Sequence, residues 1–270
     1  MRLFKTYKKG DSGVEVKFLQ RSLPWWCWSS PAASEADGQY GSKTVNAVKI
    51  FQSSEGLTED GVAGEETLRK LQVWSDVVAG IDISSYQTVD WSEVNPEEFS
   101  CVWAKATEGK TYQDTKFVDH VHGARGRGLA VGAYHFATLN NEPWAEADNF
   151  LEQIHKAGQM DLPPVLDFEK ASDDDTLQWL LAFLRQVQSE TNSTPVLYSG
   201  AWRINALKGP VSLLTEFGYW IPSWGPQPAG YGPFCNWSAW QWTNEGRVSG
   251  INGNVDRNWL LSDLLGKPNT

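Results

Sequence analysis

The sequence predicts an α/β fold, namely an incomplete TIM-like (β/α)5(β)3 barrel preceded by a small three-helix domain. Eight short strand-like runs follow residue 79, and helical segments separate the first six of them, which is typical of parallel strands. Eight strands favour closure into a barrel, but residues 80–270 are fewer than the about 250 of a complete one. Before residue 73 the pattern differs, because a short motif is repeated there.

The first domain, residues 1–72, contains two copies of the pattern D-G-x-x-G-x-x-T, at 37–44 and 60–67. The Asp-Gly pair forms a tight turn because glycine accepts positive φ, and the second glycine opens a helix. Apolar residues at roughly helical spacing follow both copies, and another helical segment spans 14–23 and ends at Pro24. Two copies are too few for a solenoid, so we expect a compact three-helix unit.

This segment resembles the peptidoglycan-binding domain type 1. The resemblance rests on Gly10, Gly13, Val16, Leu19 and Gln20 and on the segments 37–52 and 56–67. It implies a module that binds bacterial peptidoglycan, with Asp37, Tyr40 and Asp60 as candidate binding residues. The insert Trp25–Trp28 departs from the family pattern, and its rings either extend a glycan-contacting surface or pack on the helices. Residues 73–79 break the pattern and are expected to form a short linker.

The second domain, residues 80–270, contains the strand-like runs. They are 80–84, 101–106, 130–136, 163–169, 195–200, 219–224, 237–242 and 254–256. Amphipathic helices are predicted at 116–127, 143–157 and 175–190. After the sixth strand the gaps are short and rich in glycine and proline. Five βα units followed by three nearly bare strands are therefore expected.

The fourth run, PPVLDFE, ends in two carboxylates, Asp167 and Glu169. Their i, i+2 spacing places both side chains on one face of the strand, toward the barrel mouth, where enzymes on such barrels have their active sites. Two close acids cannot both ionise at low cost, so the pKa of at least one should rise. A carboxyl group with a raised pKa can protonate a leaving oxygen near neutral pH, as glycosidic cleavage requires. The alternative is that one acid forms a structural ion pair with Lys105 or Lys170.

Polar side chains at the other strand ends are expected to complete this pocket. Asp82 ends the first strand, opposite the fourth, and Asp256 follows the last strand beside it. The four acids would then form one carboxylate-lined pocket. Further candidate substrate-binding residues at strand ends are Tyr134, Tyr198, Trp224, Trp242, Lys105 and Glu108. For each aromatic residue taken alone, core packing is the alternative role.

Composition argues against several classes of function. Residues 1–72 carry a net charge of +1 and the remaining residues −11, which together give −10. An acidic second domain disfavours nucleic acid, whose binding depends on phosphate neutralisation, and stable association with anionic membranes. No apolar run approaches the roughly 20 residues of a membrane span, and the start MRLFKTYKKG has no apolar segment typical of a secretory signal. The separated cysteines Cys27, Cys101 and Cys235 predict buried free thiols rather than a disulfide framework.

No metal and no cofactor are expected. His120 and His122 are spaced i, i+2 on a predicted helix, which splays the two imidazoles apart, and no third ligand accompanies them. The sequence contains no G-x-S-x-G nucleophile elbow and no phosphate-binding G-x-x-x-x-G-K-[ST] loop.

The motifs of the second domain, taken in order, resemble glycoside hydrolase family 25, the lysozymes of the Chalaropsis type. The resemblance rests on G-I-D-I-S-x-x-Q (80–87), W-A-K-A-T-E-G (103–109), G-A-Y-H-F (132–136), P-V-L-D-F-E (164–169), P-V-L-Y-S (195–199), W-Q-W-T (240–243) and V-D-x-N (255–258). It implies an incomplete barrel, no cofactor, and hydrolysis of the β-1,4 bond between N-acetylmuramic acid and N-acetylglucosamine. By this resemblance Glu169 is the general acid, and Asp167 stabilises the N-acetyl group or the transition state. Asp82 and Asp256 complete the acidic site.

A wall-binding module joined to a muramidase barrel, without a signal peptide, resembles a phage endolysin. This implies a protein, expected to be a monomer, that stays in the host bacterial cytoplasm until a holin opens the membrane and then acts on the cell wall. Two alternatives remain open, a chitinase-like hydrolase of N-acetylglucosamine polymers and a non-catalytic cell-wall-binding protein. The chitinase pattern D-G-x-D-x-D-x-E does not occur, since Pro163–Leu166 occupy its positions, and the intact acids disfavour a non-catalytic protein.

Overall fold

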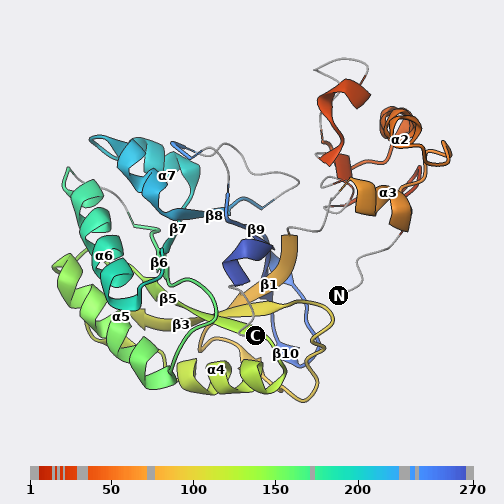
Figure 1. The fold of residues 1–270 in the computed structure, drawn as a ribbon. Helices are drawn as coiled ribbons and strands as arrows, with labels where there is room; N and C mark the ends of the chain where they lie inside the picture. The colour runs from red at the N-terminus through yellow and green to blue at the C-terminus, as the bar shows by residue number, and fades with distance from the viewer. Residues whose placement is uncertain are drawn as a thin grey trace. The chain divides into compact units, whose positions relative to one another are not determined.

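The computed structural model describes residues 6–13, 16, 19–20, 22–28, 36–71, 77–170, 174–224, 232–234 and 237–265. The chain forms two compact units, Met1–Val77 and Val78–Thr270 (Figure 1). No helix within the described residues is long and apolar enough to cross a membrane.

The first unit contains the short 3-10 helix η1 (Trp25–Cys27) and the helices α2 (Ser42–Ser54) and α3 (Glu65–Lys70). Both α2 and α3 begin within the repeat copies, after the second glycine, as the sequence predicts. The remaining helix, expected at 14–23, lies in large part outside the described residues, although Val16, Leu19, Gln20 and Ser22 are helical.

The aromatic insert of this unit packs partly inward. Cys27 and Trp28 are buried, whereas the ring of Trp26 is 44% exposed. Cys27 is a free thiol, as is the buried Cys101 of the second unit, while Cys235 lies outside the described residues. Of the two interpretations of the insert, packing holds for Trp28, and an exposed ring is present at Trp26.

A buried glutamine side chain stabilises the first repeat copy. The amide nitrogen of Gln20 donates to Asp37 Oδ1 at 2.9 Å and to Thr44 Oγ1 at 2.9 Å. Its amide oxygen accepts a hydrogen bond from the backbone N–H of Gly38 at 2.8 Å. Because Gln20 is only 2% exposed, these bonds replace water at every polar atom of the amide.

The second repeat copy has the same arrangement around Gln52, at the end of α2. Its amide nitrogen donates to Asp60 Oδ1 at 2.8 Å and to Thr67 Oγ1 at 3.1 Å, and its oxygen accepts from the N–H of Gly61 at 2.9 Å. The sequence pattern D-G-x-x-G-x-x-T thus has a physical basis. Asp and Thr are acceptors for one buried glutamine amide, and Gly at positive φ turns its N–H toward the glutamine oxygen.

The three residues chosen from sequence as wall-binding candidates therefore hold the turns together. Asp37 and Asp60 accept the glutamine bonds just described. Tyr40 is 1% exposed, and its hydroxyl donates to the carbonyl oxygen of Gly61 at 3.0 Å, which links the two copies. With its ring inside the core, Tyr40 has no face for a ligand, whereas Asp37 and Asp60 are exposed and remain candidate binding residues.

The second unit is a closed barrel whose strands run in the predicted order. The strands are β1 (Val77–Ile83), β3 (Cys101–Glu108), β5 (Ala130–Phe136), β6 (Val165–Asp167), β7 (Val196–Tyr198), β8 (Gly218–Pro222), β9 (Ala239–Gly246) and β11 (Val255–Leu261). Parallel pairing runs from β1 through β3 to β9, and β11 pairs antiparallel with β9 and lies beside β1, which closes the sheet. The predicted barrel is confirmed.

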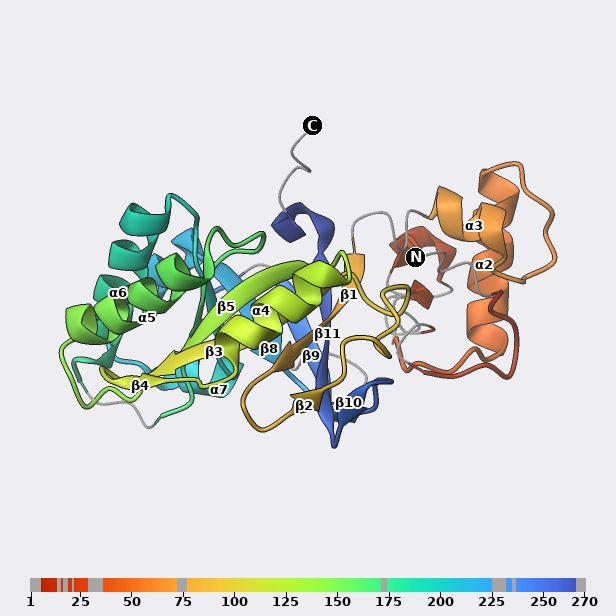
Figure 2. The ribbon, with the colours of Figure 1, turned by 90° about the horizontal axis from the view of Figure 1, so that it is seen from below.

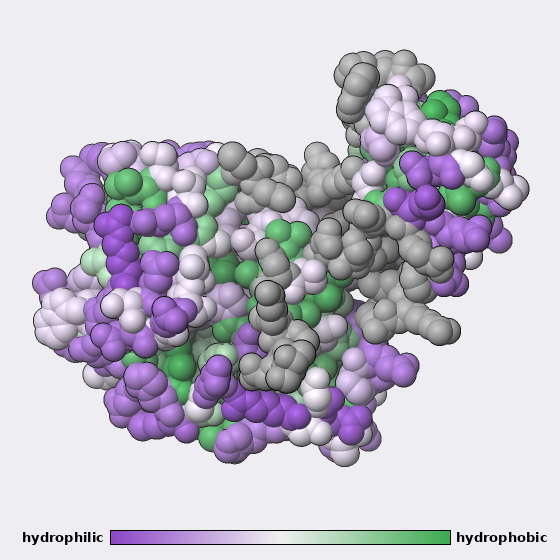
Figure 3. Space-filling view, in the orientation of Figure 1, coloured by the Kyte–Doolittle hydropathy of each residue, from purple (hydrophilic) through white to green (hydrophobic). Residues whose placement is uncertain are grey.

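Helices cover the barrel only after β3 (Figure 1). They are α4 (Phe117–Gly126), α5 (Pro143–Ala157), α6 (Thr176–Thr191) and the short α7 (Ala201–Ala206), with 3-10 turns η3 (Val211–Glu216) and η4 (Ser262–Leu265). Hydrophilic side chains cover much of the outer surface over α4 and α5 (Figure 3). The apolar stripe predicted for α6 is buried, as shown by Leu177, Leu180, Leu181, Leu184 and Val187.

Two sequence expectations differ from the structure. The connection from β1 to β3 contains no helix, because Asp90 and Asn95 accept hydrogen bonds from backbone N–H groups two residues ahead and Pro96 interrupts the run. The barrel therefore has four βα units with helices rather than five. Val77–Ala79, expected in the linker, already belong to β1.

Short ribbons extend the rim at the carboxyl ends of the strands. β2 (Thr88–Val89) pairs with β10 (Ile251–Asn252), and β4 (Tyr112–Gln113) pairs with the end of β3. Figure 2 shows β4, β2 and β10 along one edge of the barrel. Residues far apart in sequence thus meet at this edge.

Tryptophan side chains fill the barrel interior. The rings of Trp103 and Trp220 lie 4.4 Å apart, and Trp103 Nε1 donates to the carbonyl oxygen of Pro163 at 3.2 Å. Gly132 allows this packing, since a Cβ there would lie 2.4 Å from the Trp103 ring. These large rings fill the barrel below the carboxyl ends of the strands, and Trp220 lines the pocket that opens there.

Candidate active site

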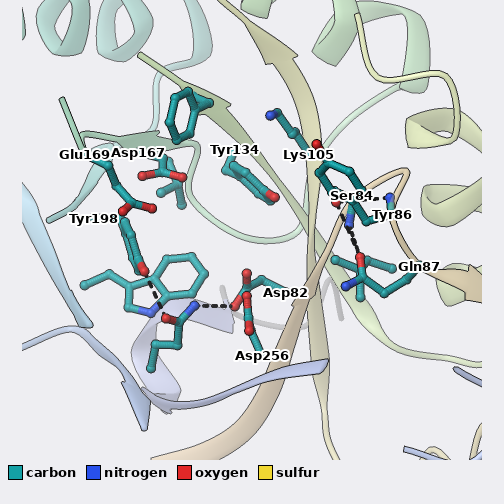
Figure 4. Close-up of a pocket in the computed structure, with 15 residues that line it drawn as sticks. Asp82, Ser84, Tyr86, Gln87, Lys105, Tyr134, Asp167, Glu169, Tyr198 and Asp256 are labelled. Carbon is teal, nitrogen blue, oxygen red and sulfur yellow. Dashed lines mark hydrogen bonds between the residues drawn. The ribbon is translucent and has the colours of Figure 1, made fainter. Parts of the chain in front are cut away.

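A pocket of about 250 Å³ opens at the carboxyl ends of the strands. Its lining includes the four predicted acids Asp82, Asp167, Glu169 and Asp256. In Figure 4, Asp82 and Asp256 lie side by side, across the pocket from Asp167 and Glu169. The strand order therefore brings together acids that are up to 174 residues apart in the chain, as the sequence analysis expected.

Asp82 is held in place by two amide side chains. Its Oδ2 accepts hydrogen bonds from Gln241 Nε2 at 3.1 Å and from Asn258 Nδ2 at 2.8 Å. Burial raises the pKa of this carboxyl group, and the two amides together with Asp256 oppose the rise by hydrogen bonding. The amides fix the orientation of Asp82 near the carboxyl end of β1.

Asp256 shares a hydrogen bond with Asp82 and holds its proton more tightly than a solvent-exposed aspartate does. Burial and the neighbouring Asp82 raise the pKa of Asp256 to about 8. At neutral pH this pair therefore keeps a proton between its two carboxyl groups, with Asp256 as the donor.

Asp167 is the last residue of β6, and its side chain lies inside the pocket. Burial and the nearby charge of Glu169 raise its pKa well above the ordinary value. Its Oδ1 is buried, and it has no hydrogen-bond partner among the described residues. A buried carboxyl oxygen without a hydrogen-bond partner destabilises the folded state, so this atom is available to accept a hydrogen bond from a ligand.

Glu169 lies two residues further, with an exposed side chain at the edge of the pocket. The backbone before it is fixed, since the Phe168 N–H donates to the Tyr198 carbonyl at 2.9 Å and the Phe168 carbonyl accepts from Ser199 Oγ at 2.8 Å. Phe168 is buried on the other face of the chain, which leaves Asp167 and Glu169 on the pocket side. The i, i+2 prediction is confirmed.

The alternative of a structural ion pair is not found for these acids among the described residues. Lys105 Nζ bonds Glu108 Oε2 at 2.7 Å, and Lys170 Nζ lies 5.1 Å from the centre of the Phe136 ring. Lys105 remains on the pocket lining and lowers the pKa of Asp167 by its charge, although burial outweighs it.

Of the four aromatic residues predicted to line the pocket, two do so and two do not. Tyr134 and Tyr198 line the pocket, and the Tyr198 hydroxyl donates to Gln241 Oε1 at 2.9 Å. Trp224 is 63% exposed beside it, with Nε1 donating to the same oxygen at 3.2 Å. Trp242 does not line the pocket, because Gln241 occupies the inward position of β9 and the Trp242 ring packs with Arg257 instead.

Sequence reasoning missed the residues that organise the acids. Gln241 and Asn258 orient Asp82, and Ser84, Tyr86 and Gln87 form the side of the pocket near β1. A signal existed for the first two, because a polar amide inside an otherwise apolar strand run is expected to have a buried partner. The described residues contain no cluster of three or more metal-ligating side chains, and His120 bonds the carbonyl oxygen of Ser84 at 3.1 Å.

The raised pKa of Asp256 predicts that the folded state loses stability as the pH rises. Between about pH 3.8 and 8 the folded chain keeps a proton that the unfolded chain releases, so stability falls as pH rises through this range. Asp256→Asn retains a donor toward Asp82 and removes the titration. We expect the variant to equal wild type near pH 4 and to be about 1–2 kcal/mol more stable at pH 8, after allowance for partial exposure.

Thermal denaturation at pH 4, 6 and 8 measures this effect, as a gain in Tm of about 2–6 °C at pH 8. An equal shift at all three pH values would show that packing, not titration, is responsible.

Known proteins resemble both units. The model of glycosyl hydrolases family 25 matches residues 81–251, and that of a peptidoglycan binding domain matches residues 12–71. Lysozyme M1 of Streptomyces globisporus is 32% identical over 204 residues, which cover 67% of each chain. The crystal structure of a bacterial lysozyme from Streptomyces coelicolor aligns with a TM-score of 0.64 at 31% identity, over 70% of this chain and 95% of that one. The CTP1L endolysin aligns with a TM-score of 0.60 at 27% identity, over 69% of this chain and 67% of that one.

Proposed function

The chain belongs to family 25 of the glycosyl hydrolases and is a muramidase with a peptidoglycan-binding domain, and from this premise we propose that Glu169 is its general acid. The observation that carries the proposal is the single pocket lined by Asp82, Asp167, Glu169 and Asp256. Its substrate is bacterial peptidoglycan, and the bond it hydrolyses is the β-1,4 linkage between N-acetylmuramic acid and N-acetylglucosamine.

Glu169 donates a proton to the glycosidic oxygen as the bond to the leaving sugar breaks. Its exposed position at the pocket edge suits this role, because the departing sugar and the proton exchanged afterwards both need access to solvent. The fixed backbone at Phe168 restricts where the Glu169 side chain can reach. Proximity and orientation of the acid then contribute to the rate.

Asp167 orients the 2-acetamido group of the sugar on the other side of the bond. The unpartnered Oδ1 would accept the acetamido N–H. A hydrogen bond to the charged form favours that form, so substrate binding would lower the pKa that burial has raised. The ionised carboxylate then stabilises the positive charge that develops as the acetamido oxygen approaches the anomeric carbon.

Asp82 and Asp256 complete the acidic site, and Tyr134 and Tyr198 form its walls. The proton shared by Asp82 and Asp256 limits the negative charge of the pocket when it is empty. Lys105 supplies the nearest positive charge on the lining. The site thus keeps its carboxyl groups close without full mutual repulsion.

For the biological role, we propose that the protein is an endolysin. The pairing of a wall-binding module with a muramidase barrel supports this, as does the similarity to the CTP1L endolysin. In this role the protein acts as a monomer, remains in the host bacterial cytoplasm and reaches the wall when a holin opens the membrane. Expression inside a host bacterium, with and without a co-expressed holin, tests it. Lysis that needs no holin would contradict this route.

The reaction itself is tested by mass spectrometry of wall fragments after digestion and borohydride reduction. Cleavage after N-acetylmuramic acid leaves muramic acid at the new reducing end, and this end becomes the reduced sugar. Fragments that end in reduced N-acetylglucosamine would contradict the assigned bond.

The wall-binding module predicts a substrate-dependent effect of truncation. Deleting residues 1–72 should leave the rate on short soluble glycan fragments within about twofold, because the barrel has its own core. On intact walls we expect a loss of about 10-fold or more, since tethering raises the local enzyme concentration at the polymer. Turbidity loss of walls and reducing-end release from soluble fragments measure the two rates. An equal loss on both substrates would mean that the deletion damages the barrel.

A further inference from the structure

Three fully buried polar side chains form a chain of hydrogen bonds between the barrel and α5. His135 of β5 lies between Thr107 of β3 and Glu146 of α5. The distance from Thr107 Oγ1 to His135 Nδ1 is 2.7 Å, and that from His135 Nε2 to Glu146 Oε2 is 3.0 Å. A hydroxyl, an imidazole and a carboxylate in this order resemble a nucleophile triad, but a hydroxyl without exposed surface cannot reach a substrate. These three residues therefore have another role.

The surroundings of Glu146 determine where the protons of this chain lie. Its carboxyl group also accepts hydrogen bonds from the Thr138 N–H at 3.0 Å, from the Thr138 hydroxyl and from Asn141 Nδ2 at 3.1 Å. Burial raises the pKa of Glu146, but the hydrogen bonds outweigh burial and lower it, so this group is a carboxylate and His135 Nε2 is its donor. Burial lowers the pKa of His135, so its Nδ1 carries no proton at neutral pH and accepts the bond from the Thr107 hydroxyl.

Thr107 follows a β-bulge near the carboxyl end of β3. Two consecutive residues of β5 pair with Lys105 and with Thr107, so Ala106 has no partner on β5. Residues three apart in a regular strand point to opposite faces, whereas the extra residue returns Glu108 to the face of Lys105. Lys105 Nζ can then bond Glu108 Oε2 at 2.7 Å. The ion pair thus depends on the bulge.

The bond to His135 holds Thr107 on the outer face of the sheet. The His135 ring stacks on Phe183 of α6, with 4.9 Å between ring centres, and lies 5.7 Å from Phe150 of α5, so it belongs to the helix layer. Without the bulge, Thr107 would point to the same face as Lys105, two residues before it. Loss of the bulge would therefore leave the buried Nδ1 of His135 without a donor, which is unfavourable.

The position of Lys105 affects the charge state of Asp167. Lys105 lies on the lining of the catalytic pocket (Figure 4), and its side chain is only 12% exposed. Burial and the neighbouring acids Glu169 and Asp82 raise the pKa of Asp167, whereas the charges of Lys105 and Arg203 lower it. A partly buried amine that loses its carboxylate partner is expected to turn toward solvent, and its effect on Asp167 would then disappear.

We propose that His135 is a positioning residue of the muramidase, which holds the β3 bulge through Thr107 and thereby keeps the charge of Lys105 at the pocket. The inference rests on the proposed function, because it concerns the ionisation that the reaction requires of Asp167. The charged groups that face His135 from the surrounding elements are Glu146 of α5 and Lys105 and Glu108 of β3.

Thr107→Val tests the proposal, because it removes the hydroxyl donor and keeps the branched shape of the side chain. NMR titration of the Asp167 carboxyl carbon, assigned by its absence in Asp167→Asn, should give a midpoint about 0.5 pH unit or more above that of wild type. Thr107→Ser keeps the hydroxyl and should restore the wild-type midpoint. The matched control is Thr191→Val, which loses a hydroxyl bond on α6, to the Val187 carbonyl at 2.7 Å, and should leave the midpoint unchanged.

His135→Gln is a second variant that breaks the same bond. Its amide nitrogen can still donate to Glu146, but it has no group in place of Nδ1 to accept from Thr107. The Asp167 midpoint should therefore rise as it does in Thr107→Val. Wild-type midpoints in the folded forms of these two variants would overturn the proposal.

A double-mutant cycle with Lys105→Met identifies the path of the effect. Lys105→Met alone should raise the Asp167 midpoint, and adding Thr107→Val should raise it no further, because the charge that Thr107 positions is absent. If Thr107→Val raises the midpoint equally with and without Lys105, the proposal is wrong.

The pH dependence of kcat/KM separates this inference from the proposed function. Asp167 acts as a carboxylate in the proposed reaction, so a higher pKa should move the acidic limb of the profile to higher pH in Thr107→Val, by the same amount as the NMR midpoint. Thr191→Val should keep the wild-type profile. A shifted midpoint with an unmoved limb would support the positioning of Lys105 and count against the assigned role of Asp167.

Discussion

Replacing Glu169 with glutamine is expected to lower kcat on peptidoglycan about 10³-fold, while the fold stays intact. The amide has nearly the same size but cannot donate a proton as an acid, so the leaving sugar must depart without protonation. The exposed side chain of Glu169 contributes little packing, which explains why stability should not change.

Two measurements separate chemistry from folding in this variant. Reducing-end release gives the rate, and thermal denaturation should give a Tm within about 2 °C of wild type. Glu190→Gln is a matched control, since it changes an exposed glutamate near the end of α6, outside the catalytic pocket. A variant at position 169 that keeps more than about a tenth of the rate would assign the general acid to another residue.

The barrel was predictable because its strands are buried on both faces and read as short apolar runs. The start of β1 was harder to predict, because Val77 follows a stretch of sequence without a hydrophobic pattern. This part of the strand is recognisable only in the structure, where β1 pairs with β3 and β11. The helix-free connection after β1 was also missed. There, turns built by Asp90 and Asn95 replace a helix, and β2 pairs with β10, 162 residues further along the chain.

Asp82, Asp167 and Glu169 were predictable because each one ends or follows a strand run, and the carboxyl ends of parallel strands meet at one rim. Asp256 was expected after the last strand, but it lies near the start of β11, which runs antiparallel to β9 and therefore begins at this rim. The residues that orient these acids were not predictable, because the sequence does not show which face of a strand a given side chain occupies. On β9 the inward position is Gln241, one residue before the predicted Trp242. Similarly, Glu146 and Asn149 belong to a helix with an amphipathic pattern, and only packing against β3 and β4 shows that both are buried.

Replacing Asp167 with asparagine is expected to lower kcat about 10²–10³-fold on N-acetylated glycan strands, with a smaller effect on KM. Asparagine preserves the shape and can still accept the acetamido N–H through its oxygen. It supplies no negative charge, however, so the positive charge that develops on the acetamido group in the transition state is left without a counter-charge. The loss should therefore appear in kcat.

The rate of Asp167→Asn on a substrate without the acetamido group identifies the cause of the loss in kcat. Strands in which the muramic acid N-acetyl groups have been removed lack the partner of Asp167 Oδ1, so wild type itself should cleave them slowly. On these strands Asp167→Asn should reduce the rate by less than about threefold, because the interaction between Asp167 and the acetamido group is already absent. Removing the buried, unpartnered carboxyl group, whose pKa burial raises, should also leave the variant at least as stable as wild type near neutral pH. If the substitution lowers the cleavage rate of both substrates by the same factor, Asp167 acts through the position of Glu169 rather than through the acetamido group.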